Sequence, residues 1–317
     1  MTSLSLTDRI IARTIGRGRL FAHGWGNEAW IERALAERRI VANRVPIKVN
    51  LLSDRLAGGV TTRDLHFVSP IPELPYEAKI AHGRWLIPTG CTPNIVYLSF
   101  PATGDDSYAA RTRFWRPLVQ EGASVVLLQY PLYGDRRPAQ QKGTWLRTVS
   151  DQVLLQFAVA QEALCLLGWL EQEGFSRLGV SGFSQGGSVA AVVASLFEKP
   201  LALASFATGL TPAPVFTQGQ LATKIDFRLL KDESRQRLHA VFEAGNLGRY
   251  PRVARPEACV IVAGKRDAYV FPHYVEALAA LWPGCDVQWH NCGHVNLWVT
   301  RANALRAAVR AASARLG

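Results

Sequence analysis

The sequence predicts an α/β protein with a mostly parallel central sheet flanked by helices. From residue 95 onward, apolar runs of strand length alternate with long helical segments. Hydrophobic residues make up 48% of the 317 positions, which is enough for one large core. A glycine-flanked serine also follows one of the apolar runs directly, as in a tight strand-to-helix turn.

The expected strands are short apolar runs at 95–100, 124–129, 177–181, 201–206, 258–263 and 286–290. The expected helices cover 108–120, 149–172, a segment that opens at Gln185, 270–281 and 296–315. Parallel strands joined by crossover helices bind ligands beyond their carboxyl ends. We therefore expect any chemistry to lie in the loops that follow the strands.

Three segments fall outside this alternation. Residues 1–59 are expected to form an N-terminal helical extension, with two helices separated by a glycine-rich break. Residues 60–88 hold short apolar runs between prolines, which is typical of an antiparallel hairpin. We assign 60–317 to a single domain and interpret 211–256 as a helical lid, because a long insertion within a compact domain is usually functional.

The net charge of +11 has two interpretations, a nucleic-acid-binding surface or a solvated basic surface. No nucleic-acid motif accompanies the charge, so we favour the second and expect no nucleic-acid partner. Basic residues recur on amphipathic helices at 6–19 and 296–315. Such helices bind anionic lipid surfaces, so we expect contact with an anionic membrane surface unless their apolar faces are buried in the core.

The cysteines and the apolar segments indicate the compartment. The five cysteines are widely spaced and include no Cys-x-x-Cys pair, so we expect neither a metal nor another cofactor. The N-terminus lacks the apolar run of a secretory signal, although its arginines resemble a weak organelle-targeting peptide. Polar residues interrupt the longest apolar stretch. We expect a cytoplasmic protein, either soluble or peripheral to a membrane.

The segment Gly182-Phe183-Ser184-Gln185-Gly186 matches the Gly-x-Ser-x-Gly nucleophile elbow. In that motif, glycines allow the sharp turn that holds a serine hydroxyl above the sheet. The motif alone is weak, and an idle serine in a glycine-rich turn is the alternative. An apolar strand before it and a helix that is apolar on all sides after it favour Ser184 as a nucleophile.

The partners of this serine follow in the chain order acid, then histidine. Asp267 is the only carboxylate in the loop after the strand at 258–263, and His294 follows the strand at 286–290. A serine hydroxyl needs an imidazole to take its proton, and a carboxylate holds that imidazole in the correct tautomer. We therefore predict an α/β-hydrolase fold with the triad Ser184, Asp267 and His294.

Stabilising an oxyanion requires two backbone N–H donors. The residue after the nucleophile, Gln185, supplies one of them. The loop after the strand at 95–100 supplies the other, from Ala102 or Thr103. Asp105 and Asp106 follow in the same loop. They could lie near the pocket, but a role in turns or surface ion pairs is at least as well supported by the sequence.

These residues resemble the family of α/β-hydrolase domain-containing protein 18. The likeness rests on ordered motifs along nearly the whole chain: Phe21-Ala22-His23-Gly24-Trp25-Gly26, Phe67-Val68-Ser69-Pro70, Ala102-Thr103-Gly104-Asp105, Pro131-Leu132-Tyr133-Gly134, Gly182 to Gly187, Val215-Phe216-Thr217-Gln218-Gly219, Trp282-Pro283-Gly284-Cys285 and Gly293-His294. The sequence departs from the family pattern at Gln185, Ala102 and Asn291-Cys292, where methionine, glycine and Glu-Gly are usual. The resemblance implies a serine hydrolase acting on an acyl ester, with lipid esters among the candidates.

The expected reaction is hydrolysis of a carboxylic ester through an acyl-enzyme on Ser184. A thioesterase or an acyltransferase would use the same three residues with a different leaving group or acceptor. A non-catalytic binding protein on the same fold is the alternative from another class. The complete triad argues against it, because a degenerate copy would be expected to lose at least one member.

Overall fold

A computed structural model describes residues 4–14, 19–36, 45–231 and 234–317. Within these residues a nine-stranded sheet has the order β1-β2-β3-β5-β4-β6-β7-β8-β9. The strands are β1 Asn50–Ala57, β2 Val60–Val68, β3 Ile80–Pro88, β4 Ile95–Phe100, β5 Ala123–Leu128, β6 Leu178–Phe183, β7 Ala202–Phe206, β8 Cys259–Gly264 and β9 Asp286–His290. Neighbouring strands from β1 to β5 in this order pair antiparallel, and all later pairs are parallel. The mostly parallel sheet predicted from the sequence is confirmed.

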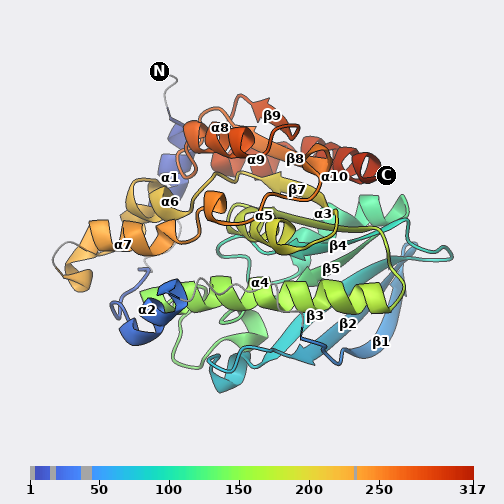
Figure 1. Ribbon diagram of the computed structural model, residues 1–317, viewed down its shortest axis with the longest axis horizontal. Coiled ribbons are helices and arrows are strands. Elements are labelled where there is room, and N and C mark those ends of the chain that lie inside the picture. Colours follow the sequence, from blue (N-terminus) through green and yellow to red (C-terminus); the bar gives the residue numbers. More distant parts are fainter. Residues whose placement is uncertain (1–3, 15–18, 37–44, 232–233) are drawn as a thin grey trace.

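Helices cover both faces of the sheet (Figure 1). Residues of α3 Ala109–Gln120, α9 His294–Thr300 and α10 Ala302–Leu316 share one apolar cluster with one face of the strands. Residues of α4 Val149–Gln172, α5 Gln185–Leu196 and α8 Pro272–Leu281 belong to the cluster on the other face. Every residue of β4, β6 and β8 is buried, which explains why these strands are apolar without alternation.

The long helix α4 belongs to the protein core. Its start is fixed by a capping box in which Thr148 Oγ1 accepts from Asp151 N and the Asp151 carboxylate accepts from Thr148 N. Among the described helices it alone is long and apolar enough to cross a membrane, and 72% of its apolar window is buried inside the protein. Its polar Glu162 is fully paired, because Arg136 donates two hydrogen bonds to that carboxylate.

Two predicted boundaries differ from the structure. The expected helical extension 1–59 contains α1 Leu6–Thr14 and α2 Glu28–Ala36, but its last part is strand β1. Every residue of β1 is exposed, so no buried face marked it as a strand in the sequence. The helix expected over 296–315 is two helices, α9 and α10, which are separated at Arg301, where φ is −117°.

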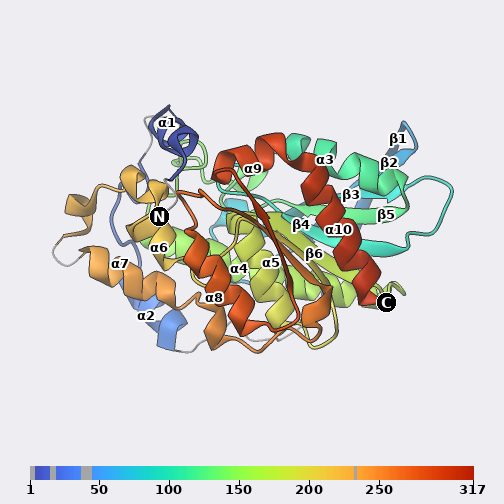
Figure 2. The same ribbon diagram turned by 90° about the horizontal axis from the view of Figure 1, so that it is seen from above.

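The N-terminal helices and the lid gather at one end of the molecule, away from the C-terminal end of α10 (Figure 2). The segment 211–256, interpreted from the sequence as a lid, contains short helices and turns, and its residues 232 and 233 lie outside the described residues. It consists of α6 Ala213–Thr217, α7 Ser234–Glu243 and the 3-10 turns η3 Gln220–Lys224, η4 Phe227–Leu230 and η5 Leu247–Arg249. The remaining 3-10 turns are η1 Tyr76–Ala78, η2 Gly134–Arg136 and η6 Pro256–Ala258.

Candidate active site

The candidate site lies where the strand order reverses. From β4 the chain crosses by α3 to β5 on one side, and α4 returns it to β6 on the other side of β4. Phe100 at the end of β4 pairs with Gly182 near the end of β6, so the loops after both strands begin at the same level. Such a switch point opens a crevice beyond the strand ends, which is where α/β sheets bind ligands.

Ser184 occupies a strained turn between β6 and α5. Its backbone angles are φ 56° and ψ −118°, a region that non-glycine residues rarely adopt. Strain of this kind costs about 1–3 kcal/mol and persists where the surroundings enforce it. Here Ser184 N donates to Phe206 O at 2.8 Å, which anchors the turn to β7.

Glycine is required on the inner side of this turn. A side chain on Gly182 would collide with the backbone of Gly186. A Cβ on Gly186 would lie 2.5 Å from Phe100 O and 2.6 Å from Pro101 O. The two glycines therefore let the start of α5 approach the loop after β4, and this approach brings the two predicted halves of the oxyanion hole together.

Asp267 and His294 form a buried pair at the neighbouring strand ends. His294 Nδ1 lies 2.7 Å from Asp267 Oδ2. The other carboxylate oxygen of Asp267 accepts from the backbone N–H groups of Tyr269 and Val270, both at 2.8 Å. Asp267 is 1% exposed and His294 is 6% exposed. Burial and the bonds to both oxygens of the carboxylate therefore fix the geometry of the pair.

The surroundings of His294 favour its protonated form. Burial of the ring lowers its pKa, but the charge and hydrogen bond of Asp267, together with the charge of Asp8, outweigh burial and raise the pKa above its ordinary value. The ring of Tyr269 lies 4.8 Å from the imidazole, centroid to centroid. Burial raises the pKa of Tyr269 to about 12, so this phenol stays neutral near pH 7.

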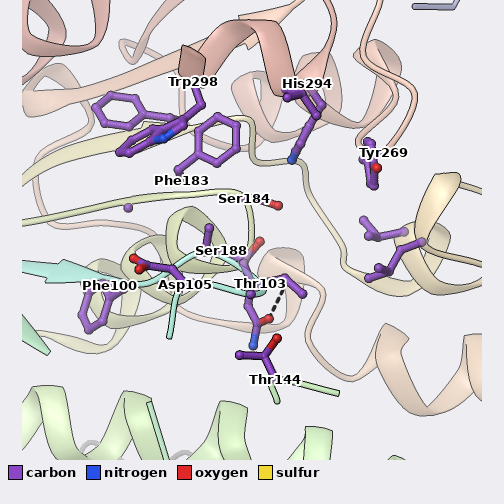
Figure 3. Close-up of a pocket in the computed structure, with 18 of the residues that line it drawn as sticks. Phe100, Thr103, Asp105, Thr144, Phe183, Ser184, Ser188, Tyr269, His294 and Trp298 are labelled. Carbon is purple, nitrogen blue, oxygen red and sulfur yellow. Dashed lines mark hydrogen bonds between the residues drawn. The ribbon is translucent and has the colours of Figure 1, made fainter. Parts of the chain in front are cut away.

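Ser184 and His294 line the same cavity. Figure 3 shows the hydroxyl of Ser184 below the imidazole, with a ring nitrogen of His294 directed toward it. Within the described residues no hydrogen bond joins the two side chains, and such contacts often tighten only when substrate binds. The structure thus brings together the serine, the histidine and the aspartate that the sequence singled out.

The predicted oxyanion-hole residues also meet. Thr103 Oγ1 donates to Gln185 Oε1 at 2.7 Å, and both residues line the cavity that Ser184 also lines. Gln185 is the first residue of α5, so its backbone N–H lies at a helix N-terminus and has no partner within the helix. Neither this N–H nor those of Ala102 and Thr103 donate to another described residue. Such N–H groups can stabilise an oxyanion.

The loop after β4 is held by ion pairs. Asp105 accepts from Arg111 Nε at 2.6 Å, and the buried Arg111 also donates to Ser99 O and Leu128 O. Asp106 pairs with Arg137 at 3.0 Å. Both aspartates line the cavity, so the two roles considered for them in the sequence coexist.

The cavity is large and mostly apolar. Its volume is about 620 Å³, within the range of small-molecule sites. Its walls include aromatic side chains from both sheet faces and the lid: Phe100, Phe114, Phe183, Phe206, Phe216, Tyr269 and Trp298. A second cavity of about 290 Å³ shares Gln156, Ser188, Pro212 and Phe216 with the first. The segment 211–256, which the sequence suggests is a lid, thus contributes a wall of the cavity.

Two findings concern groups outside the triad. No cluster of three or more His, Cys, Asp or Glu within the described ranges could hold a metal ion. Sequence reasoning missed Asp8, whose carboxylate accepts from the backbone N–H groups of His294, Val295 and Ala268. No local signal could identify it, because its partners lie more than 250 residues further along the chain.

The switch-point crevice, the strained serine elbow and the acid and histidine loops define an α/β-hydrolase. Comparison with known proteins agrees. The chain belongs to the family described as alpha/beta hydrolase domain containing 18, whose model matches residues 18–239 and 231–315. The resemblance noted in the sequence is thereby confirmed.

Curated relatives match only in part. Uncharacterized proteins of Mycobacterium tuberculosis, from strains CDC 1551 / Oshkosh and H37Rv, are each 29% identical over 200 residues. Each match covers 60% of this chain and 46% of the relative. The chain therefore spans about half the length of these relatives.

Solved structures show the same fold. Acetyl xylan esterase 1 from Thermoanaerobacterium sp. JW/SL YS485 matches with a TM-score of 0.62 and 17% identity, covering 98% of this chain and 99% of that one. The acetyl xylan esterase from Paenibacillus sp. R4 matches with a TM-score of 0.61 and 18% identity, and the match covers 91% of this chain and 96% of that one. At such identities the likeness concerns the fold alone.

Proposed function

We propose that the protein is a serine hydrolase that cleaves carboxylic esters with an apolar acyl group. The observation that carries the proposal is the strained Ser184 elbow, which shares one cavity with His294, itself hydrogen-bonded to the buried Asp267. Strain at a non-glycine residue is retained where a function needs it.

The proposed reaction passes through an acyl-enzyme. His294 takes the proton from Ser184 Oγ as that oxygen attacks the ester carbonyl carbon, and the oxyanion is stabilised by the backbone N–H groups of Gln185 and of Ala102 or Thr103. Collapse of the tetrahedral intermediate breaks the C–O bond, and His294 gives its proton to the leaving alkoxide. Water, deprotonated by His294, then cleaves the acyl-enzyme to the acid and regenerates Ser184.

The cavity supports an acyl group longer than acetyl. Aromatic walls and a volume of about 620 Å³ suit a substrate that buries apolar surface. Each buried methylene contributes about 0.8 kcal/mol, so a chain of several carbons would gain substantially over acetate. A lipid ester fits this description, as does a branched or aromatic acid ester.

Labelling with a fluorophosphonate probe tests the proposal directly. We expect wild-type protein to be labelled and Ser184→Ala to lose both labelling and ester turnover, with an unchanged thermal unfolding curve. Residual turnover within tenfold of wild type in that variant would overturn the assignment of Ser184. Parallel assays with thioesters, and with alcohols added as acceptors, separate ester hydrolysis from thioesterase and acyltransferase activity on the same residues.

A further inference from the structure

The helix that precedes the hydrolase domain reaches the candidate active site. Its inward face carries the buried residues Asp8 and Ala12, and Ser5, just before the helix begins, is buried as well. Ser5 N donates to Arg266 O at 2.9 Å, next to the acid loop, and Ala12 lines the main cavity. Helix α1 therefore packs on the site itself.

Asp8 is the centre of this contact. Its side chain is fully buried, and no basic side chain of the described residues pairs with it. Asp8 Oδ2 accepts from His294 N at 2.8 Å and from Ala268 N at 3.2 Å, and Oδ1 accepts from Val295 N at 3.0 Å. One carboxylate thus bonds to the residue after Asp267 and to the backbone of the histidine.

These bonds replace a missing helix cap. Helix α9 begins at His294, and its N-cap residue Gly293 has no side chain to accept from the first N–H groups. The carboxylate of Asp8 accepts from two of them and places a negative charge at the positive end of the helix. A Cβ on Gly293 would collide with Ser5 and lie 2.5 Å from Asp8 Oδ2, so glycine is needed there to admit α1.

We propose that Asp8 is a positioning residue of the catalytic site, which holds the histidine of α9 and the acid loop after β8 in their mutual geometry. The proposal rests on the proposed serine-hydrolase function. The two loops are already joined by a backbone bond from Arg266 N to Cys292 O at 3.1 Å, so they can meet without Asp8. Asp8 adds bonds from one carboxylate to both loops, and these bonds fix the His294 backbone and thereby the direction in which its ring points.

Asp8→Asn tests this role, since it keeps the side-chain shape but removes the charge and turns one acceptor oxygen into a donor. We expect kcat per labelled site to fall on the order of tenfold to 10²-fold, as for small misplacements of catalytic groups, while KM changes little. Fluorophosphonate titration counts the competent sites, so a variant that merely folds less well loses sites and keeps its kcat per site. Unchanged kcat per site in Asp8→Asn would overturn the proposal.

The pH profile supplies a second readout. Among the described residues, the charged groups that act on the His294 ring are Asp267 from the acid loop and Asp8 from α1. Tyr269 faces it as a neutral phenol, burial raises the pKa of the Cys292 thiol, and Arg301 lies beside that thiol. Removing the charge of Asp8 leaves less negative charge to favour the imidazolium, so the acid limb of kcat/KM should move to lower pH. A limb at the wild-type position would count against the proposal.

Asp151→Asn is a matched control. Asp151 also bonds to backbone at a helix N-terminus, in the capping box of α4, and it does not line the cavity. We expect it to lower the melting temperature without changing kcat per site or the acid limb. An equal fall in kcat per site in both variants would overturn a specific role for Asp8.

Hydrogen exchange separates this proposal from the proposed function. We expect faster exchange of the amides of Ala268, His294 and Val295 in Asp8→Asn, whether or not an ester substrate has been found. If the wild type is not labelled by fluorophosphonate but the variant shows this faster exchange, the proposed function is refuted. The structural role of Asp8 in holding the two loops would still be supported. Unchanged exchange at all three amides would refute the role of Asp8.

Discussion

The hydroxyl of Thr103 donates to Gln185 Oε1 at 2.7 Å and so links the loop after β4 to the first residue of α5. The link joins the two segments whose backbone N–H groups are proposed to stabilise the oxyanion. Because the side chain of Gln185 holds the loop while its backbone N–H is the group proposed to stabilise the oxyanion, changes of the side chain should have mild effects on kcat. The family resemblance suggests the substitution to test, since methionine is usual at this position.

We predict that Gln185→Met lowers kcat by tenfold or less. A lost hydrogen bond between neutral groups contributes about 0.5–1.5 kcal/mol, which corresponds to roughly two- to tenfold in rate. Thr103→Val removes the same bond from the other side and should give a similar loss, with no further loss in the double variant. A 10²-fold or larger fall in Gln185→Met would mean that its side chain itself contacts the reacting atoms.

The Asp267–His294 pair sets the expected pH dependence. The base must be neutral to accept a proton, and its pKa is raised above the ordinary value of about 6.5. Activity should therefore rise with pH along a limb whose midpoint lies above about pH 6.5. Asp267→Asn should lower kcat by roughly 10³ or more, because the histidine is then held in the wrong tautomer.

Steady-state kinetics of Asp267→Asn between pH 5 and about 9 measure both effects. Removing the carboxylate charge should also shift the acid limb to lower pH, since less negative charge then favours the imidazolium. A twofold fall in kcat, with the limb unmoved, would point to another acid. Asp286→Asn is a suitable control, because that carboxylate pairs with Arg315 on the surface.

The sequence predicted the parallel half of the sheet and singled out the three residues that meet at the candidate site, because both depend on local patterns. Buried strands such as β4 and β6 are continuous apolar runs, and Ser184, Asp267 and His294 each follow one of them in the chain order of the fold. Strand β1 was missed because every residue in it is exposed. Asp8 was missed because its role arises only from packing α1 against loops far along the chain.

Phe216, in the segment interpreted as a lid, is one of the residues that the two cavities share. It stacks on Phe242 with ring centroids 4.2 Å apart and lines both spaces. If the lid builds an acyl pocket, octanoyl esters should show a higher kcat/KM than acetyl esters. Phe216→Leu should move the preference toward longer chains, because a smaller side chain opens the way into the second cavity.

A series of ester substrates from acetyl to palmitoyl measures this preference. Phe175→Leu is a matched control, since Phe175 packs against Trp85 away from the main cavity. It should leave the ratio between long and short chains unchanged. Equal kcat/KM for acetyl and octanoyl esters in the wild type would count against a lid that forms an acyl pocket.

The basic amphipathic segments singled out in the sequence differ in what they leave exposed. The apolar face of α10 is buried, including Leu305, Val309 and Leu316, and Arg310 and Arg315 are paired with Glu121 and Asp286. Helix α1, in contrast, exposes 69% of Leu6 and 51% of Ile10 beside Arg9, at the end of the molecule that holds the lid (Figure 2). Of the two helices, only α1 therefore remains a candidate for contact with a membrane.

We propose that α1 contacts an anionic membrane surface next to the cavity that Ala12 lines. Burying Leu6 and Ile10 at the headgroup boundary would stabilise binding, and each nearby Lys or Arg would add about 1 kcal/mol by attraction to acidic lipid. Both residues are exposed, and helical spacing places each of them about half a turn from Asp8, so replacing them should leave the site intact. Leu6→Ser with Ile10→Ser should weaken binding without changing kcat on a soluble ester.

Co-sedimentation with vesicles of phosphatidylcholine alone, or with a third of phosphatidylserine, measures this contact at low and high salt. We expect binding to the anionic vesicles only, weakened by salt because screening shortens the reach of surface charges. Val299→Ser is a control for simple loss of surface hydrophobicity, because Val299 is also exposed and apolar but lies on α9. If the wild type fails to bind anionic vesicles even at low salt, the surface contact is refuted and a soluble ester becomes the better candidate substrate.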